Sequence, residues 1–187
     1  MAHSDPSASK AHPSDNIPIT PVITAEQISA RIATLGAQIR NDIGPGELTL
    51  LCILKGSFIF TADLARAISG PVSIEFLGVT SYGDDTQSSG AVRITHDLTK
   101  PIAGRDVVIV EDIVDSGLTL QYLTHVLSAR RPASLRVCAL LEKKSANAPL
   151  KPDYVGFEVD DDFVVGYGLD WAQRLRNLPY IGAVQIK

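Results

Sequence analysis

Apolar residues follow two alternating patterns along the chain. Short unbroken apolar runs, typical of strands buried on both faces of a parallel sheet, occupy residues 48–54, 73–79, 107–110 and 135–141. Apolar side chains at helical spacing precede the first run, in residues 28–39, and lie between later runs, in residues 57–68 and 120–127. Strands that alternate with helices predict an α/β fold, with a central, mainly parallel sheet flanked by helices on both faces.

Local signals mark where these elements begin and end. Thr24-Ala-Glu-Gln27 matches a capping box, so the first helix should begin there and end near Asn41. Pro132 should stop the third helix, after Arg130 and Arg131, whose charges suit a helix C-terminus. Further short strands are expected at residues 91–98, 154–159, 163–166 and 179–186.

Two segments lack periodicity. Residues 1–18 are rich in Ser, Pro, Ala, His and Asp, which predicts a disordered tail ahead of a single domain over residues 19–187. Residues 80–90 are polar and contain no core residues. A loop of that length in a compact domain is usually a mobile lid or a disordered segment.

Composition narrows the class of protein. With 187 residues, 45% of them apolar and 20% charged, the chain suits a soluble globular protein. A net charge of −4 argues against bulk nucleic-acid binding, and no apolar run approaches the roughly 20 residues that span a membrane. Cys52 and Cys138 each lie in an apolar run, which indicates buried reduced thiols and a cytoplasmic protein.

The candidate chemistry begins where the apolar run 107–110 meets Glu111 and Asp112. The segment 115–119, Asp-Ser-Gly-Leu-Thr, then forms a turn into a helix, whose N-terminal N–H groups attract anions. Carboxylates accept hydrogen bonds from hydroxyls and attract Mg²⁺, so a ligand with both a phosphate and sugar hydroxyls fits. The alternative is an ordinary strand before a capped helix, but folding alone gains nothing from adjacent buried carboxylates.

Two other strands end in charged residues. Lys55-Gly56 follows the run 48–54, and Lys143-Lys144 follows the run 135–141. Ligands of open α/β sheets bind beyond the carboxyl ends of the strands. We therefore expect these lysines to meet the carboxylates of residues 111–115 at one site.

The segment 107–119 resembles the phosphoribosyl-pyrophosphate (PRPP) signature of type I phosphoribosyltransferases: four apolar residues, two acids, two apolar residues, then Asp-(Ser/Thr)-Gly-x-Thr. Other segments are similar to hypoxanthine-guanine phosphoribosyltransferases, from about Thr20 to the C-terminus. They are residues 53–58, 81–83, 140–143, 151–158 and 163–170, with Arg176 downstream. The resemblance implies the type I fold, with a small hood region and a mobile lid loop.

For the PRPP signature, the resemblance implies roles around the sugar phosphate. The 5′-phosphate would be cradled by Ser116, Gly117, Leu118 and Thr119. Glu111 and Asp112 would contact the ribose hydroxyls, directly or around Mg²⁺; which of the two is the direct contact stays open. Asp115 would be the general base that takes the proton from purine N7 as N9 attacks the sugar carbon.

For pyrophosphate, the resemblance implies Lys55, Gly56 and Arg176. Arg174 lies two residues before Arg176 and could be mistaken for it in this assignment. The peptide that joins Leu54 and Lys55 is often cis in such proteins. Ser81 and Tyr82 would belong to the lid that excludes water.

For the purine, the resemblance implies four residues. Lys143, preferred on register to Lys144, would donate to the exocyclic oxygen of a 6-oxopurine. Phe163 would stack on the base, and Val164 would offer backbone groups to its edge. Asp170 would lie beside the base and help to hold Mg²⁺.

The implied reaction is Mg²⁺-dependent purine salvage: hypoxanthine or guanine plus PRPP gives IMP or GMP plus pyrophosphate. The partners are these small molecules, with no nucleic acid and no membrane, and relatives suggest a homodimer or homotetramer. Three alternatives stay open. They are a xanthine- or xanthine/guanine-preferring enzyme, a PRPP-binding regulator without catalysis, and a generic sugar-phosphate binding module.

Overall fold

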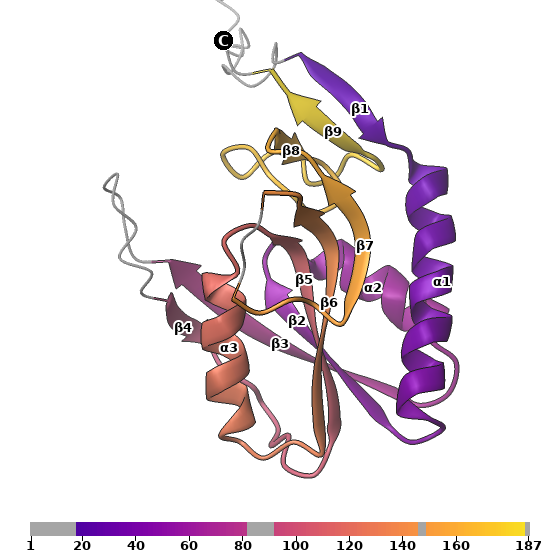
Figure 1. The fold of residues 1–187 in the computed structure, drawn as a ribbon, viewed down its shortest axis with the longest axis vertical. Coiled ribbons are helices and arrows are strands. Elements are labelled where there is room, and N and C mark those ends of the chain that lie inside the picture. The colour runs from indigo at the N-terminus through magenta and orange to yellow at the C-terminus, as the bar shows by residue number, and fades with distance from the viewer. Residues whose placement is uncertain (1–17, 82–91, 146–148, 186–187) are drawn as a thin grey trace, which may run out of the picture.

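The computed structural model describes residues 18–81, 92–145 and 149–185, and its centre is a six-stranded sheet (Figure 1). The strands lie in the order β4 (Val92–His96), β3 (Val72–Ser81), β2 (Leu48–Leu54), β5 (Asp106–Val114), β6 (Ser134–Lys143) and β7 (Tyr154–Val159). Every neighbouring pair is parallel except β3 and β4, which are antiparallel. The predicted α/β fold with a mainly parallel sheet is therefore confirmed.

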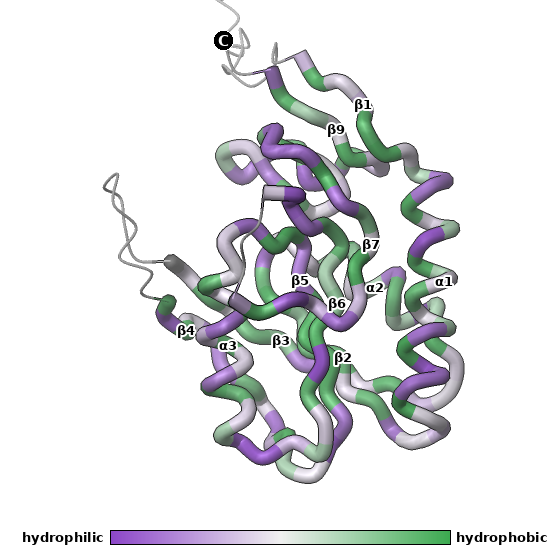
Figure 2. Tube along the Cα trace, in the orientation of Figure 1, coloured by the Kyte–Doolittle hydropathy of each residue, from purple (hydrophilic) through white to green (hydrophobic). Residues whose placement is uncertain are grey.

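Helices cover both faces of this sheet. On one face, α1 (Ala25–Ile43) and α2 (Phe58–Ala67) pack on β-strand residues such as Leu50 and Val108. On the other face, α3 (Leu118–Ser128) packs on residues such as Leu51 and Ile109. Successive strand residues thus pack into two separate cores, which is why the middle residues of β2, β5 and β6 are mostly apolar, coloured green in Figure 2.

A second, three-stranded sheet forms a hood over one end of the first (Figure 1). Its strands are β1 (Ile19–Ile23), β9 (Ile181–Val184) and β8 (Phe163–Val165), all antiparallel. β8 and β9 match expected strands, but β1 was not expected. With two prolines in residues 18–21 it lacks a strand signal, and it exists through pairing with β9 at the far end of the chain.

The boundaries of two elements bear on the site. Helix α1 begins with the predicted capping box, because Thr24 Oγ1 accepts from the Gln27 N–H at 3.3 Å and Gln27 Oε1 accepts from the Thr24 N–H at 2.8 Å. Strand β5 does not end at its apolar run, as the sequence suggested, but continues through Glu111 and Asp112 to Val114. Pairing with β6 carries it on, from Glu111 opposite Ala139 to Val114 opposite Glu142.

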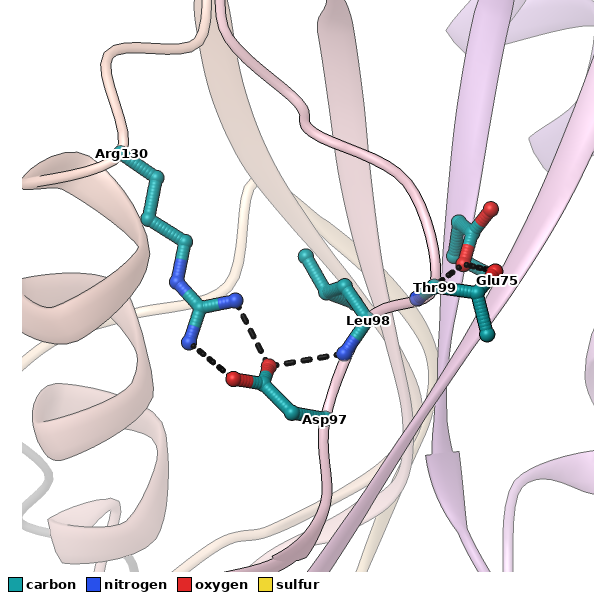
Figure 3. A network of polar contacts seen from close by, with 5 residues as sticks. All are labelled: Glu75, Asp97, Leu98, Thr99 and Arg130. Atoms are coloured by element: carbon teal, nitrogen blue, oxygen red, sulfur yellow. Dashed lines mark hydrogen bonds and ion pairs between the residues drawn. The ribbon is translucent and has the colours of Figure 1, made fainter.

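Polar contacts hold the chain segment that follows the edge strand β4 (Figure 3). Asp97 accepts two hydrogen bonds from Arg130, at 2.6 and 3.0 Å, just beyond the end of α3. Two residues on, the N–H and hydroxyl of Thr99 donate to the buried Glu75 of β3 at 3.0 and 2.8 Å. The end of α3 that the sequence marked with arginines is therefore tied to the segment after β4.

Candidate active site

The turn between β5 and α3 encloses a pocket of about 100 Å³, which we call the turn pocket. Gly117 sets the turn with a φ of 72°, in the left-handed region that favours glycine. Leu118 was also predicted here, but it is 45% exposed and does not line the pocket; its N–H donates to Ser116 Oγ at 3.5 Å. The pocket is lined by five residues predicted from sequence: Glu111, Asp115, Ser116, Gly117 and Thr119.

Glu111 brings a buried carboxylate to the turn pocket. Among the described residues, its Oε2 atom has no hydrogen-bond partner. Burial, and then the charge of neighbouring Asp112, raise the pKa of Glu111 well above its ordinary value. A buried oxygen of this kind calls for a donor or cation from outside the protein.

A second pocket of about 290 Å³ lies between the ends of β5 and β6 and the hood strand β8; we call it the sheet-end pocket. It gathers residues that the sequence placed on separate elements: Asp112, Asp115, Lys143, Phe163, Val164 and Asp170. Ile113, Asp162 and Leu169 also line it and were missed. Their one signal was adjacency to Asp112, Phe163 and Asp170.

Glu111 and Asp112 serve different pockets. Glu111 lines the turn pocket and Asp112 the sheet-end pocket, since neighbouring strand residues point to opposite faces. Burial raises the pKa of Asp112, although an N–H bond from Ile113 at 2.9 Å and the charge of Arg176 act the other way. Asp115 lines both pockets and so joins them.

The two adjacent lysines that end β6 differ in their partners. Lys143 donates to Asp115 Oδ2 at 3.0 Å and lines the sheet-end pocket. Lys144 donates to Asp160 Oδ1 at 2.8 Å, and its side chain is 55% exposed to solvent. The placement of Lys143 in the pocket agrees with the register argument.

Phe163 offers a ring to the sheet-end pocket. It is 44% exposed, and Trp171 packs edge-on against it with ring centroids 5.0 Å apart and an interplanar angle of 82°. An edge-to-face contact leaves the remaining surface of the Phe163 ring available to a ligand.

The Lys55-Gly56 turn lies in close contact with both the sheet and the hood. The Leu54–Lys55 peptide bond is cis, as the resemblance implied. A Cβ atom on Gly56 would overlap the carboxylate of Asp112, and a Cβ atom on Gly168 would overlap the carbonyl of Gly56. Only glycines permit this close approach of β2, β5 and the loop after β8.

The loop of residues 166–178, which we call the hood loop, brings Arg176 to Asp170. Arg176 forms an ion pair with Asp170 Oδ1 at 2.6 Å and donates to the Gly168 carbonyl, also at 2.6 Å. Lys55 Nζ donates to Gln173 Oε1 of the same loop at 3.3 Å. Arg174, two residues earlier, exchanges backbone hydrogen bonds with Trp171 of the same loop.

The other predicted residues are Ser81, Tyr82 and the two cysteines. Ser81 is the last residue of β3, and Tyr82 lies outside the described residues, as do the tail residues 1–17. Cys52 and Cys138 are buried free thiols, as predicted. Within the described ranges, no helix is long and apolar enough to cross a membrane.

The carboxylates fit a metal ion that a ligand would share. Among residues 18–81, 92–145 and 149–185, no group of three or more His, Cys, Asp or Glu side chains forms a ready metal site. Mg²⁺ is commonly bound by one or two carboxylates together with substrate phosphates. Either the unpartnered oxygen of Glu111 in the turn pocket or the carboxylates of Asp112 and Asp170 in the sheet-end pocket suit that kind of site.

Comparisons with known proteins agree with this geometry. Residues 22–172 match the family model described as a phosphoribosyl transferase domain. A hypoxanthine-guanine phosphoribosyltransferase of Mycobacterium tuberculosis is 54% identical over 170 residues, covering 87% of this chain and 84% of that protein. One from Bacillus subtilis is 45% identical, covering 88% and 92%. A solved structure of one from Bacillus anthracis superposes with a TM-score of 0.86 at 40% identity, covering 91% and 100%.

Proposed function

Because this chain belongs to the hypoxanthine-guanine phosphoribosyltransferase family, we propose that it joins hypoxanthine or guanine to PRPP, giving IMP or GMP and pyrophosphate. The observation that carries the proposal is the position of Asp115, which lines both pockets. A phosphate in one pocket and a purine in the other would thus meet at a single carboxylate.

The turn pocket would bind the 5′-phosphate. Ser116, Gly117, Leu118 and Thr119 supply N–H groups and hydroxyls at the start of α3, where the helix dipole favours an anion. Glu111, whose buried oxygen lacks a partner in the described protein, would accept a hydrogen bond from a ribose hydroxyl.

The sheet-end pocket would bind the purine. Phe163 would stack on the base, and the backbone of Val164 would meet its edge. Lys143 would donate to the 6-oxo group. Adenine presents an amino donor at that position, so a lysine there favours hypoxanthine and guanine.

Asp115 would act as the general base. It would accept the proton from N7 as N9 forms the bond to the anomeric carbon and the bond from that carbon to pyrophosphate breaks. Its ion pair with Lys143 holds the carboxylate at the mouth of the purine pocket. A purine would bind both partners, with O6 accepting from Lys143 and N7–H donating to Asp115.

Pyrophosphate would lie between the Lys55-Gly56 turn and the hood loop, where Lys55 and Arg176 supply positive charge. Mg²⁺, held by Asp112 and Asp170 or by Glu111, would neutralise the leaving pyrophosphate. Ser81 and Tyr82 would belong to a lid that excludes water from the oxocarbenium-like transition state.

One assay tests the proposal: nucleotide formation from PRPP and Mg²⁺ with hypoxanthine, guanine, xanthine and adenine in turn. We expect IMP and GMP at rates at least tenfold above any product from adenine. Preferential use of xanthine would identify a xanthine/guanine enzyme instead. PRPP binding without product from any base would identify a regulator.

We also propose that the chain forms a homodimer or homotetramer. Large apolar side chains are exposed beside each other on β3, where Ile74 is 41% and Phe76 44% exposed. Both point to the face covered elsewhere by α1 and α2. We expect Phe76→Lys to lower the mass measured by light scattering, and Val22→Lys, an exposed apolar position on the hood, to leave it unchanged.

A further inference from the structure

Tyr167 links the hood loop to α2 through a hydrogen bond that has no role in the proposed chemistry so far. Its side chain is 6% exposed, and its hydroxyl donates to Asp63 Oδ2 on α2. Asp63 also forms an ion pair with Arg66 one turn along the helix. Burial, and then Asp63, raise the pKa of Tyr167, so its hydroxyl remains a donor throughout the physiological range.

This hydrogen bond lies beside the two halves of the proposed pyrophosphate site. The residue after Tyr167 is Gly168, which packs against the Gly56 carbonyl and accepts a hydrogen bond from Arg176 at 2.6 Å. On the other side, α2 begins at Phe58, two residues after Gly56. The Tyr167–Asp63 hydrogen bond therefore bridges the same junction as the Gly56–Gly168 contact.

Packing alone does not fill this junction. Tyr167 and Asp63 both line a groove of about 590 Å³ that is open to solvent between α1, α2 and the hood loop, with Ile28, Ile32 and Leu178 among its other walls. On the groove side these two residues face solvent rather than packed protein, so fewer contacts fix the geometry there. A directional hydrogen bond then has more influence on how the loop sits.

We propose that Tyr167 and Asp63 are positioning residues for the pyrophosphate group: their hydrogen bond sets the separation between the Lys55-Gly56 turn and the loop that carries Asp170 and Arg176. The inference rests on the proposed function and assigns these two residues a part in it. Phe163 and Val164 lie on β8, which β9 holds through its own register. Loss of the Tyr167–Asp63 bond should therefore affect pyrophosphate more than purine.

Tyr167→Phe removes the hydroxyl and keeps the ring. We expect it to raise the KM for PRPP about tenfold, as one lost positioning hydrogen bond would, while the KM for hypoxanthine changes less than twofold. In calorimetry without purine, affinity for magnesium pyrophosphate should fall by a similar factor. Asp63→Asn keeps an acceptor and should stay close to wild type, whereas Asp63→Leu should match Tyr167→Phe.

Tyr154→Phe is a matched control. Tyr154 is also buried, and its hydroxyl donates to an aspartate on a helix, Asp42 Oδ2, at 2.9 Å; it also accepts a hydrogen bond from Arg136 at 2.7 Å. It lies at the start of β7, the end of the sheet away from the site. We expect Tyr154→Phe to lower the melting temperature as much as Tyr167→Phe does, without changing the KM for PRPP.

The outcomes separate the two proposals. A wild-type protein that forms no nucleotide overturns the proposed function and this inference with it. An active wild type whose Tyr167→Phe variant keeps its KM for PRPP and its pyrophosphate affinity overturns the positioning role alone. An equal rise in the KM for PRPP from Tyr154→Phe would show a general loss of stability and overturn it too.

Discussion

The ammonium group of Lys143 lies 3.0 Å from Oδ2 of Asp115, across the ends of neighbouring strands β5 and β6. The side chain of Lys143 is 20% exposed and that of Asp115 is 65% exposed. A pair this open is worth little to stability. Its value lies in geometry, because it places the proposed purine donor and the proposed general base at one pocket before a ligand arrives.

Asp115→Asn should lower kcat by about 10²–10⁴ with little change in the KM for PRPP, since the amide keeps the size of the side chain but accepts no proton. Steady-state kinetics with hypoxanthine at saturating PRPP measures this. Equal losses in kcat and in PRPP affinity would contradict the role of general base.

Lys143→Met should raise the KM for hypoxanthine about tenfold or more, because the 6-oxo group loses its charged donor. The KM for PRPP should change much less. Lys144→Met is the control: this lysine pairs with Asp160 rather than with Asp115, and its loss should leave both constants within twofold. The reverse ranking of the two variants would assign purine recognition to Lys144.

Gly56→Ala should weaken PRPP binding by at least tenfold, because the new Cβ overlaps the Asp112 carboxylate and must displace it or the turn. Isothermal titration with PRPP and Mg²⁺ measures the loss. Gly46→Ala provides the comparison, since nothing lies within 4 Å of a Cβ at that position. If both variants bind PRPP like the wild type, the close approach of Gly56 to Asp112 is not needed for PRPP binding.

Both cysteines should resist Ellman's reagent at pH 8 in the folded protein. Burial raises the pKa of the Cys138 thiol to about 12 and raises that of Cys52 as well. A thiol reacts as its thiolate, and below the pKa the protonated form dominates, so only about one in 10⁴ Cys138 thiols would be ionised at pH 8. In denaturant both should react; rapid labelling without denaturant would show that they are accessible.

The fluorescence of Trp171 should report the purine site. It is the single tryptophan of the chain, and its ring packs on Phe163, which lines the sheet-end pocket. GMP should change its emission, and Phe163→Ala should reduce that change together with GMP affinity. An emission that responds to pyrophosphate but not to GMP would place the purine elsewhere.

Much of the site was predictable because its residues lie in short segments. The strand, acidic pair and turn of residues 107–119 follow one another in the chain, and so do Phe163 and Val164. Local spacing fixed the capping box of α1 and the buried strands. Asp162 and Leu169 were missed because adjacency to a predicted site residue does not show which neighbours face the pocket; the packing of the hood on the sheet decides that.

By itself, the sequence determined the α/β alternation, the adjacent carboxylates on the strand 106–114 and the glycine turn into α3, since each depends on residues within a few positions of one another. The tertiary structure decided that Glu111 and Asp112 serve different pockets, that Lys143 rather than Lys144 meets Asp115, and that Ile19–Ile23 forms a strand. It also brought Tyr167 to Asp63, 104 positions apart. These are contacts between distant segments, and no local periodicity records which segments the packed core will bring together.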